Sequence, residues 1–150
     1  MSKLGRIKEN IKFVLDTLKR KEILGNVQVD DFKSSVFSRN FSKFPAAVLS
    51  TASTDSQSVT NVQNLRTYTF DIVVMVKKED VSSPEQVEDL IESILNEFDN
   101  DPTLKGGGNT GEADGGVMPS SSSPAPVDGT NYIAFVVTLQ VKAVRDLSYV

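Results

Sequence analysis

The sequence contains no cysteine, no histidine and no tryptophan among its 150 residues. It therefore offers no thiolate nucleophile, no imidazole base, no disulfide and no soft or nitrogen ligand for a metal. Carboxylates, Lys, Arg, Ser, Thr and Tyr remain, and these could support a glycosidase pair or an oxygen-ligand metal site. Because no spacing in the sequence favours either, we expect no enzyme activity and no catalytic, metal-binding or cofactor-binding residue.

A long apolar run and a basic run are missing as well. No apolar stretch approaches the roughly 20 residues of a membrane helix, and residues 1–6 lack the apolar core of a signal peptide. The net charge of -4 is spread over both signs, without the electrostatic footprint of a nucleic-acid-binding protein. These features predict a cytoplasmic protein that has no membrane partner and does not bind DNA tightly.

The composition that remains is typical of a globular domain. Hydrophobic residues make up 39% of the chain and charged residues 24%, which is enough apolar material for a core. Two domains of 75 residues would each bury too little surface to be stable. The length therefore predicts a single domain over residues 1–150.

Two segments have the period of an amphipathic helix. In the first, apolar residues between Leu4 and Leu18 recur three and four positions apart, and Gly25-Asn26 would end it. The second begins with Ser83 as N-cap, Pro84 at the first helical position and Gln86 as part of a capping box. It would end at Asp101-Pro102. Its apolar stripe, expected to cover a sheet, consists of Val87, Leu90, Ile91, Ile94, Leu95 and Phe98.

Two long segments, 66–77 and 132–144, alternate as strands with one buried face. Short extended pieces are expected within 27–44, and Pro45 precedes a further strand at 46–51. The predicted fold is α+β, with a curved antiparallel or mixed sheet packed against one main amphipathic helix, an N-terminal helix and long polar arms. The core-facing residues predicted in the two long strands are Tyr68, Phe70, Ile72, Val74 and Val76 in the first, and Ile133, Phe135, Val137, Leu139 and Val141 in the second.

The polar arms are two segments that are too polar to be core and too long to be simple turns. Residues 52–64 are rich in Ser, Thr, Asn and Gln and are predicted to form a long hairpin loop whose flanks can extend the strands. Residues 106–129 are rich in Gly, Ser, Pro and Asp, with a short strand expected at Val117-Met118. Loops of this length within a domain are usually functional or ordered by a partner.

Two motifs within or beside the second arm could suggest a ligand site, but the sequence gives little support for either site. The glycine cluster at 106–116 has neither the spacing of a dinucleotide site nor a phosphate-binding lysine, and it follows a helix rather than preceding one. Four carboxylates flank it and could hold a hard cation, but the alternation of a calcium loop is missing, so we interpret them as solvated. These carboxylates are Asp99, Asp101, Glu112 and Asp114.

The charged faces of the two helices are also interpreted as solvated. Arg66 and Asp71 belong to a central strand, where a charge needs a partner from the sheet or from a neighbouring subunit. A partner from a neighbouring subunit would favour assembly. The basic helix face consists of Lys8, Lys12, Lys19, Arg20 and Lys21, and the acidic one of Glu85, Glu88, Asp89, Glu92 and Glu97.

The order of elements resembles the tail terminator proteins of long-tailed phages. The resemblance extends over roughly the whole chain and is architectural, because each motif alone is unspecific. The motifs that carry it are Phe44-Pro45-Ala46-Ala47-Val48-Leu49-Ser50, Thr67-Tyr68-Thr69-Phe70-Asp71-Ile72-Val73-Val74, the helix beginning Ser83-Pro84-Glu85, Asp101-Pro102-Thr103-Leu104, Gly116-Val117-Met118-Pro119-Ser120 and Tyr132-Ile133-Ala134-Phe135-Val136-Val137.

The resemblance implies a structural virion protein that forms a homohexameric ring, caps the tail tube, ends tail polymerisation and docks the head-side connector. Its implied partners are other copies of itself, the tail tube protein and the head-side connector or neck protein. Genomic DNA would pass through the ring without sequence-specific binding. The implied location is the tail or neck of the virion, after assembly in the host cytoplasm.

Three alternatives stay open from the sequence. The first is another head-tail joining or neck protein of the same virion region, and the second is an adaptor domain of a cellular complex. The third is a small hydrolase or transferase that uses Asp and Ser, with a Ser-Lys pair in place of a triad. Ring formation, alone or with a tube protein, would separate these possibilities.

Overall fold

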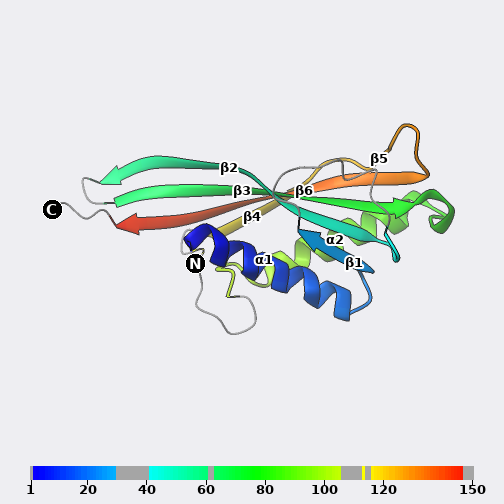
Figure 1. The fold of residues 1–150 in the computed structure, drawn as a ribbon, viewed down its shortest axis with the longest axis horizontal. Helices are drawn as coiled ribbons and strands as arrows, with labels where there is room; N and C mark the ends of the chain where they lie inside the picture. The colour runs from blue at the N-terminus through cyan, green and yellow to red at the C-terminus, as the bar shows by residue number, and fades with distance from the viewer. Residues whose placement is uncertain (1, 30–40, 61–62, 106–112, 114–115, 147–150) are drawn as a thin grey trace.

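The computed structural model describes residues 2–29, 41–60, 63–105, 113 and 116–146. In these ranges the chain forms two α-helices, a short 3-10 turn η2 and six β-strands (Figure 1). Their bounds are α1 Lys3–Arg20, β1 Asn26–Val29, β2 Ala46–Thr60, β3 Gln63–Lys77, η2 Lys78–Asp80, α2 Pro84–Asp99, β4 Gly116–Ser121, β5 Ala125–Pro126 and β6 Tyr132–Asp146.

The strands form one mixed, open sheet in the order β1-β2-β3-β6-β4, with β5 also paired to β6. β1 runs parallel to β2, whereas the other pairs are antiparallel. The α+β fold with a curved mixed sheet that the sequence predicts is therefore confirmed. The long strands β2, β3 and β6 form its centre.

One face of the sheet carries the hydrophobic core, and both helices pack against it (Figure 1). Side chains alternate between the two faces of a strand, so the residues of each long strand divide into two sets. All five core residues predicted in β3 are buried, as are Phe135, Val137, Leu139 and Val141 of β6. The fifth residue predicted in β6, Ile133, is partly buried against the core.

Helix α1 ends earlier than the glycine at position 25 predicts. Its N-cap Ser2 accepts a hydrogen bond from the Gly5 N–H, and the helix stops at Arg20. Glu22 adopts a left-handed φ of 61°, and the Ile23 N–H donates back to the Leu18 carbonyl over 3.0 Å. This is the Schellman arrangement of a helix C-terminus, with glutamate in place of the usual glycine.

Helix α2 begins at the predicted position but is capped differently. Ser83 makes no side-chain cap bond, and the Gln86 side chain accepts from the Ser82 N–H at 2.9 Å rather than from the N-cap Ser83, so the predicted capping box does not form. The helix ends at Asp99, just before the predicted Asp101-Pro102. Within the predicted stripe, Val87, Ile94 and Phe98 are buried, whereas Leu90, Ile91 and Leu95 are partly buried at its sides.

The structure corrects the loop predicted at 52–64. β2 continues to Thr60 and β3 begins at Gln63, so this segment is mostly paired strand, while residues 61–62 lie outside the described residues. In the second predicted arm, the short strand expected at Val117-Met118 is the longer strand β4, and β5 follows it. Residues 106–112 and 114–115 lie outside the described residues.

Candidate assembly surfaces

The ends of β2, β3 and β6 extend beyond both helices as a three-stranded projection (Figure 1). We call this projection, with the strand residues at its base, the arm and define it as residues 53–60, 63–69 and 140–146, which pair across the three strands; at the base, β4 also pairs with β6 as far as Lys142. In its β2 strand, residues 53–57 are all polar and exposed. Arg66 Nε donates to Ser56 Oγ of the neighbouring strand at 3.2 Å. Tyr68, Val141 and Ala143 anchor the base of the arm in the core, and backbone pairing joins its strands beyond them.

A register shift marks the place where β2 enters the arm. The pairing of β2 with β3 slips between Thr51 and Ser53, whereas β3 and β6 pair without a shift along their whole length. One extra residue in one strand bends that strand and increases its local twist. The register shift therefore gives β2 a local bend and twist where it enters the arm.

The edge of β2 away from β3 is open over most of its length. β1 pairs only with Ala46 to Leu49, and none of the described strands pairs with this edge along residues 50–60. Unpaired N–H and C=O groups in a row form a template for another strand. The open β2 edge is therefore a surface on which a second chain can add.

The direction of each backbone group on this edge follows from the ladder. The Lys78 N–H donates to the Asn131 carbonyl at 2.9 Å, so even-numbered residues of β3 bond to β6 and odd-numbered ones bond to β2. Asp55 is paired with Thr67, and its backbone faces β3. The N–H of Thr54 consequently faces the open edge.

The opposite edge of the sheet is better protected. In β4 the outward N–H of Val117 already donates to the Pro102 carbonyl at 3.1 Å. Two residues further, Pro119 has no N–H to offer at the same edge, a common protection of edge strands. The two edges of the sheet therefore differ in their capacity to accept a strand.

Both charged residues singled out in the central strand have partners inside the sheet. Thr138 Oγ1 of β6 donates to Asp71 Oδ1 at 3.0 Å, on the face opposite the core. Arg66 bonds to Ser56, as described above. The sequence leaves open whether these partners come from the sheet or from a neighbouring subunit. In the structure both partners come from the sheet.

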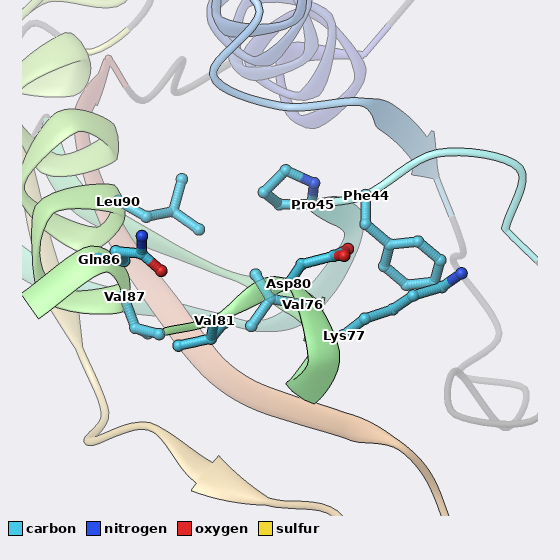
Figure 2. Close-up of a pocket in the computed structure, with 9 residues that line it drawn as sticks. All are labelled: Phe44, Pro45, Val76, Lys77, Asp80, Val81, Gln86, Val87 and Leu90. Atoms are coloured by element: carbon cyan, nitrogen blue, oxygen red, sulfur yellow. The ribbon is translucent and has the colours of Figure 1, made fainter. Parts of the chain in front are cut away.

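A small hollow lies between α2 and the start of β2. Figure 2 shows Pro45, Val81, Val87 and Leu90 around it, with Asp80 beside them. Its volume is about 250 Å³, below the roughly 300–1,000 Å³ of typical ligand sites. Lys77 Nζ lies 5.0 Å from the centre of the Phe44 ring and also forms an ion pair with the Glu79 carboxylate. The hollow therefore has the size of an apolar indentation rather than of a cofactor site.

A second hollow, of about 460 Å³, opens beside the first turn of α2. Its walls are mostly apolar, and Glu88 contributes the charged group at its rim. The apolar lining residues are Val81, Pro84, Val87, Pro124, Ala125, Pro126 and Ile133. The hollow is large enough to take an apolar side chain from another protein.

The carboxylates that flank the glycine cluster are only partly described. Asp101 Oδ1 accepts from the Lys105 N–H at 2.8 Å and stabilises the turn after α2. Asp99 is exposed, while Glu112 and Asp114 lie outside the described residues. In the part of the chain that the structure describes, no three carboxylates are grouped as metal ligands. Neither described helix is long and apolar enough to cross a membrane.

A comparison with models of known protein families gives no match to this chain. A comparison with curated proteins gives no match either. The resemblance to tail terminators therefore stays a prediction from the sequence.

Proposed function

We propose that this protein is a structural, non-enzymatic subunit of a long-tailed phage that forms a six-membered ring at the end of the tail tube. In this role it ends tube polymerisation and presents a docking surface to the head-side connector. Its location would be the tail or neck of the virion. The observation that carries the proposal is the open β2 edge on a polar, three-stranded arm.

An open edge on a projecting arm suits assembly for a physical reason. Backbone pairing between subunits satisfies N–H and C=O groups that a monomer leaves to water, and a closed ring repeats that joint without a free end. The partners are other copies of the chain, the tail tube protein and the connector. Genomic DNA would pass through the ring without sequence-specific contacts.

The proposal is tested by electron microscopy of phage lysates that lack this protein. Tails of uncontrolled length are expected, because nothing ends tube growth. Restoring the gene should restore tails of one length joined to filled heads. Normal-length tails joined to filled heads in the absence of the protein would show that the proposal is wrong.

A neck protein would use the same surfaces in another place. A head-tail joining or neck protein of the same virion region is the close alternative to a tail terminator. An open strand edge suits assembly in both roles. Tails of normal length that fail to join heads would favour the neck protein over the terminator. The lysate experiment thus separates the two roles by tail length.

A further inference from the structure

The two helices carry opposite charge. Helix α1 contains six Lys and Arg residues and two acidic ones, whereas α2 contains six acidic residues and no Lys or Arg. The whole chain has a net charge of only -4, so this separation is much stronger than the overall composition suggests. Complementary patches of this kind orient protein association and raise its rate.

On α1, the side that faces α2 is known from two contacts. Asn10 Nδ2 donates to the Leu104 carbonyl at 2.7 Å, and Lys21, just after the helix, pairs with Glu97 of α2 at 2.9 Å. Residues of a helix are about 100° apart, which places Lys12 and Lys19 about 160–180° from Asn10. Both are exposed, and Lys12 also pairs with Asp16. We call Lys12 and Lys19 the basic flank.

On α2, the same construction starts from Glu97, which faces α1 through Lys21. Glu88 and Asp99 lie about 160–180° around the helix from Glu97, and both are exposed. Glu92 lies between them along the helix. We call Glu88, Glu92 and Asp99 the acidic flank.

The two flanks lie at opposite sides of the subunit. α1 packs beside β1, and α2 packs beside β4, which are the two ends of the sheet order. Each helix turns its charged flank away from the other helix. Within the two helices, the outward flank of α1 is therefore basic and that of α2 is acidic.

Apolar surface accompanies each flank. Val29 of β1 is 36% exposed on the basic side. On the acidic side, Glu88 lines the rim of the 460 Å³ apolar hollow. The open β2 edge lies on the same side of the sheet as β1 and the basic flank.

We infer that the basic flank of α1 docks against the acidic flank of α2 in a second copy of this chain. Such an interface joins different surfaces of identical subunits, so repetition gives a ring or a filament rather than a two-fold dimer. The inference rests on the proposed ring and adds to it the surfaces through which neighbours meet. It also makes the open β2 edge face the neighbour.

Charge reversal tests this docking with the full-length chain. One variant carries Lys12→Glu and Lys19→Glu, a second carries Glu88→Lys and Asp99→Lys, and each should need at least roughly tenfold higher concentration for half-assembly. Mixed in equal amounts, the two variants should assemble again, because each then supplies the flank that the other lacks. Sedimentation velocity measures the assembled fraction.

The matched control places the same charge change at exposed positions outside the acidic flank. Glu79→Lys with Asp89→Lys is this control, and wild-type assembly is expected. Wild-type assembly by both flank variants would overturn the docking while leaving the ring proposal standing. A mixture that fails to assemble although each variant melts like wild type would also overturn it. A wild type that never associates would remove the ring and the docking together.

Discussion

Among the described residues, Asn10 is a polar side chain buried in the core, with 4% of its surface exposed. Its amide donates to the carbonyl of Leu104, a fully buried residue held at a left-handed φ of 51°. One hydrogen bond thus ties α1 to the turn that follows α2. A carbonyl left unsatisfied in such a place costs more than an average hydrogen bond contributes.

Replacing Asn10 with alanine should therefore lower the free energy of unfolding by about 1–3 kcal/mol. Urea denaturation followed by circular dichroism measures the change. The exposed Asn96→Ala is the control and should stay within about 0.5 kcal/mol of wild type. Equal effects of the two substitutions would show that the bond to Leu104 does not stabilise the fold.

Gly25 has a different role from the helix stop that the sequence predicts. Its N–H donates to the Pro45 carbonyl at 2.8 Å, and a Cβ atom at this position would lie 2.8 Å from the Phe44 carbonyl oxygen. Glycine is needed here because two backbone segments approach closely. The sequence marks a special backbone position correctly but cannot say which constraint applies.

Gly25→Ala should lower the free energy of unfolding by about 1–3 kcal/mol, because the contact is to backbone that has little room to move. Gly129→Asn is the comparison, since nothing lies within 4 Å of its Cβ position and asparagine tolerates the φ of 74°. That variant should be close to wild type in urea denaturation. A neutral Gly25→Ala would mean that the β1–β2 junction adjusts freely.

At the scale of elements, periodicity predicts most of the fold. The core faces of β3 and β6 and the apolar stripe of α2 are confirmed because burial imposes a strict period of 2.0 or 3.6 residues. Residues 66–69 and 140–144 of the arm lie in the predicted strands, whereas 53–60 are predicted as part of a loop, because Ser, Thr and Gln held by backbone pairing leave little hydrophobic pattern. The strand-forming residues Thr54, Val59 and Thr60 are the weak signal in this segment.

The most deeply buried part of the α2 stripe differs from the predicted centre of the stripe. Ile91, in the middle of the predicted stripe, is partly buried, whereas Ile94 is fully buried. Ile94→Ala should cost about 2–5 kcal/mol of stability, and the chemically identical Ile91→Ala should cost clearly less. Thermal melting of the two variants side by side compares them. The reverse order of stabilities would show that α2 is rotated relative to the sheet.

The arm gives a prediction that uses two adjacent residues. Thr54→Pro removes an N–H that faces the open edge, so the melting temperature should hardly change while self-association weakens. Asp55→Pro removes an N–H that faces β3, so the melting temperature should fall. Light scattering and thermal melting report the two properties separately. Unimpaired self-association of Thr54→Pro would show that no strand adds to this edge.

At the scale of the whole molecule, three features lie in one consistent arrangement. The basic flank and the open β2 edge lie toward one side of the sheet, and the acidic flank with its apolar hollow lies toward the other. Neighbouring copies placed side by side would bring the basic flank of one against the acidic flank of the next. Charge screening should make the association weaken as salt rises, since exposed charges are screened beyond about 8–10 Å at physiological ionic strength.

The most direct test of the account is the mass and shape of the purified chain in solution. Light scattering over a range of concentrations, with negative-stain electron microscopy of the same samples, should show closed rings of six chains. Six chains of 16.4 kDa give a mass of about 98 kDa. A strict monomer at every concentration, both alone and with a tail tube protein, would contradict the account.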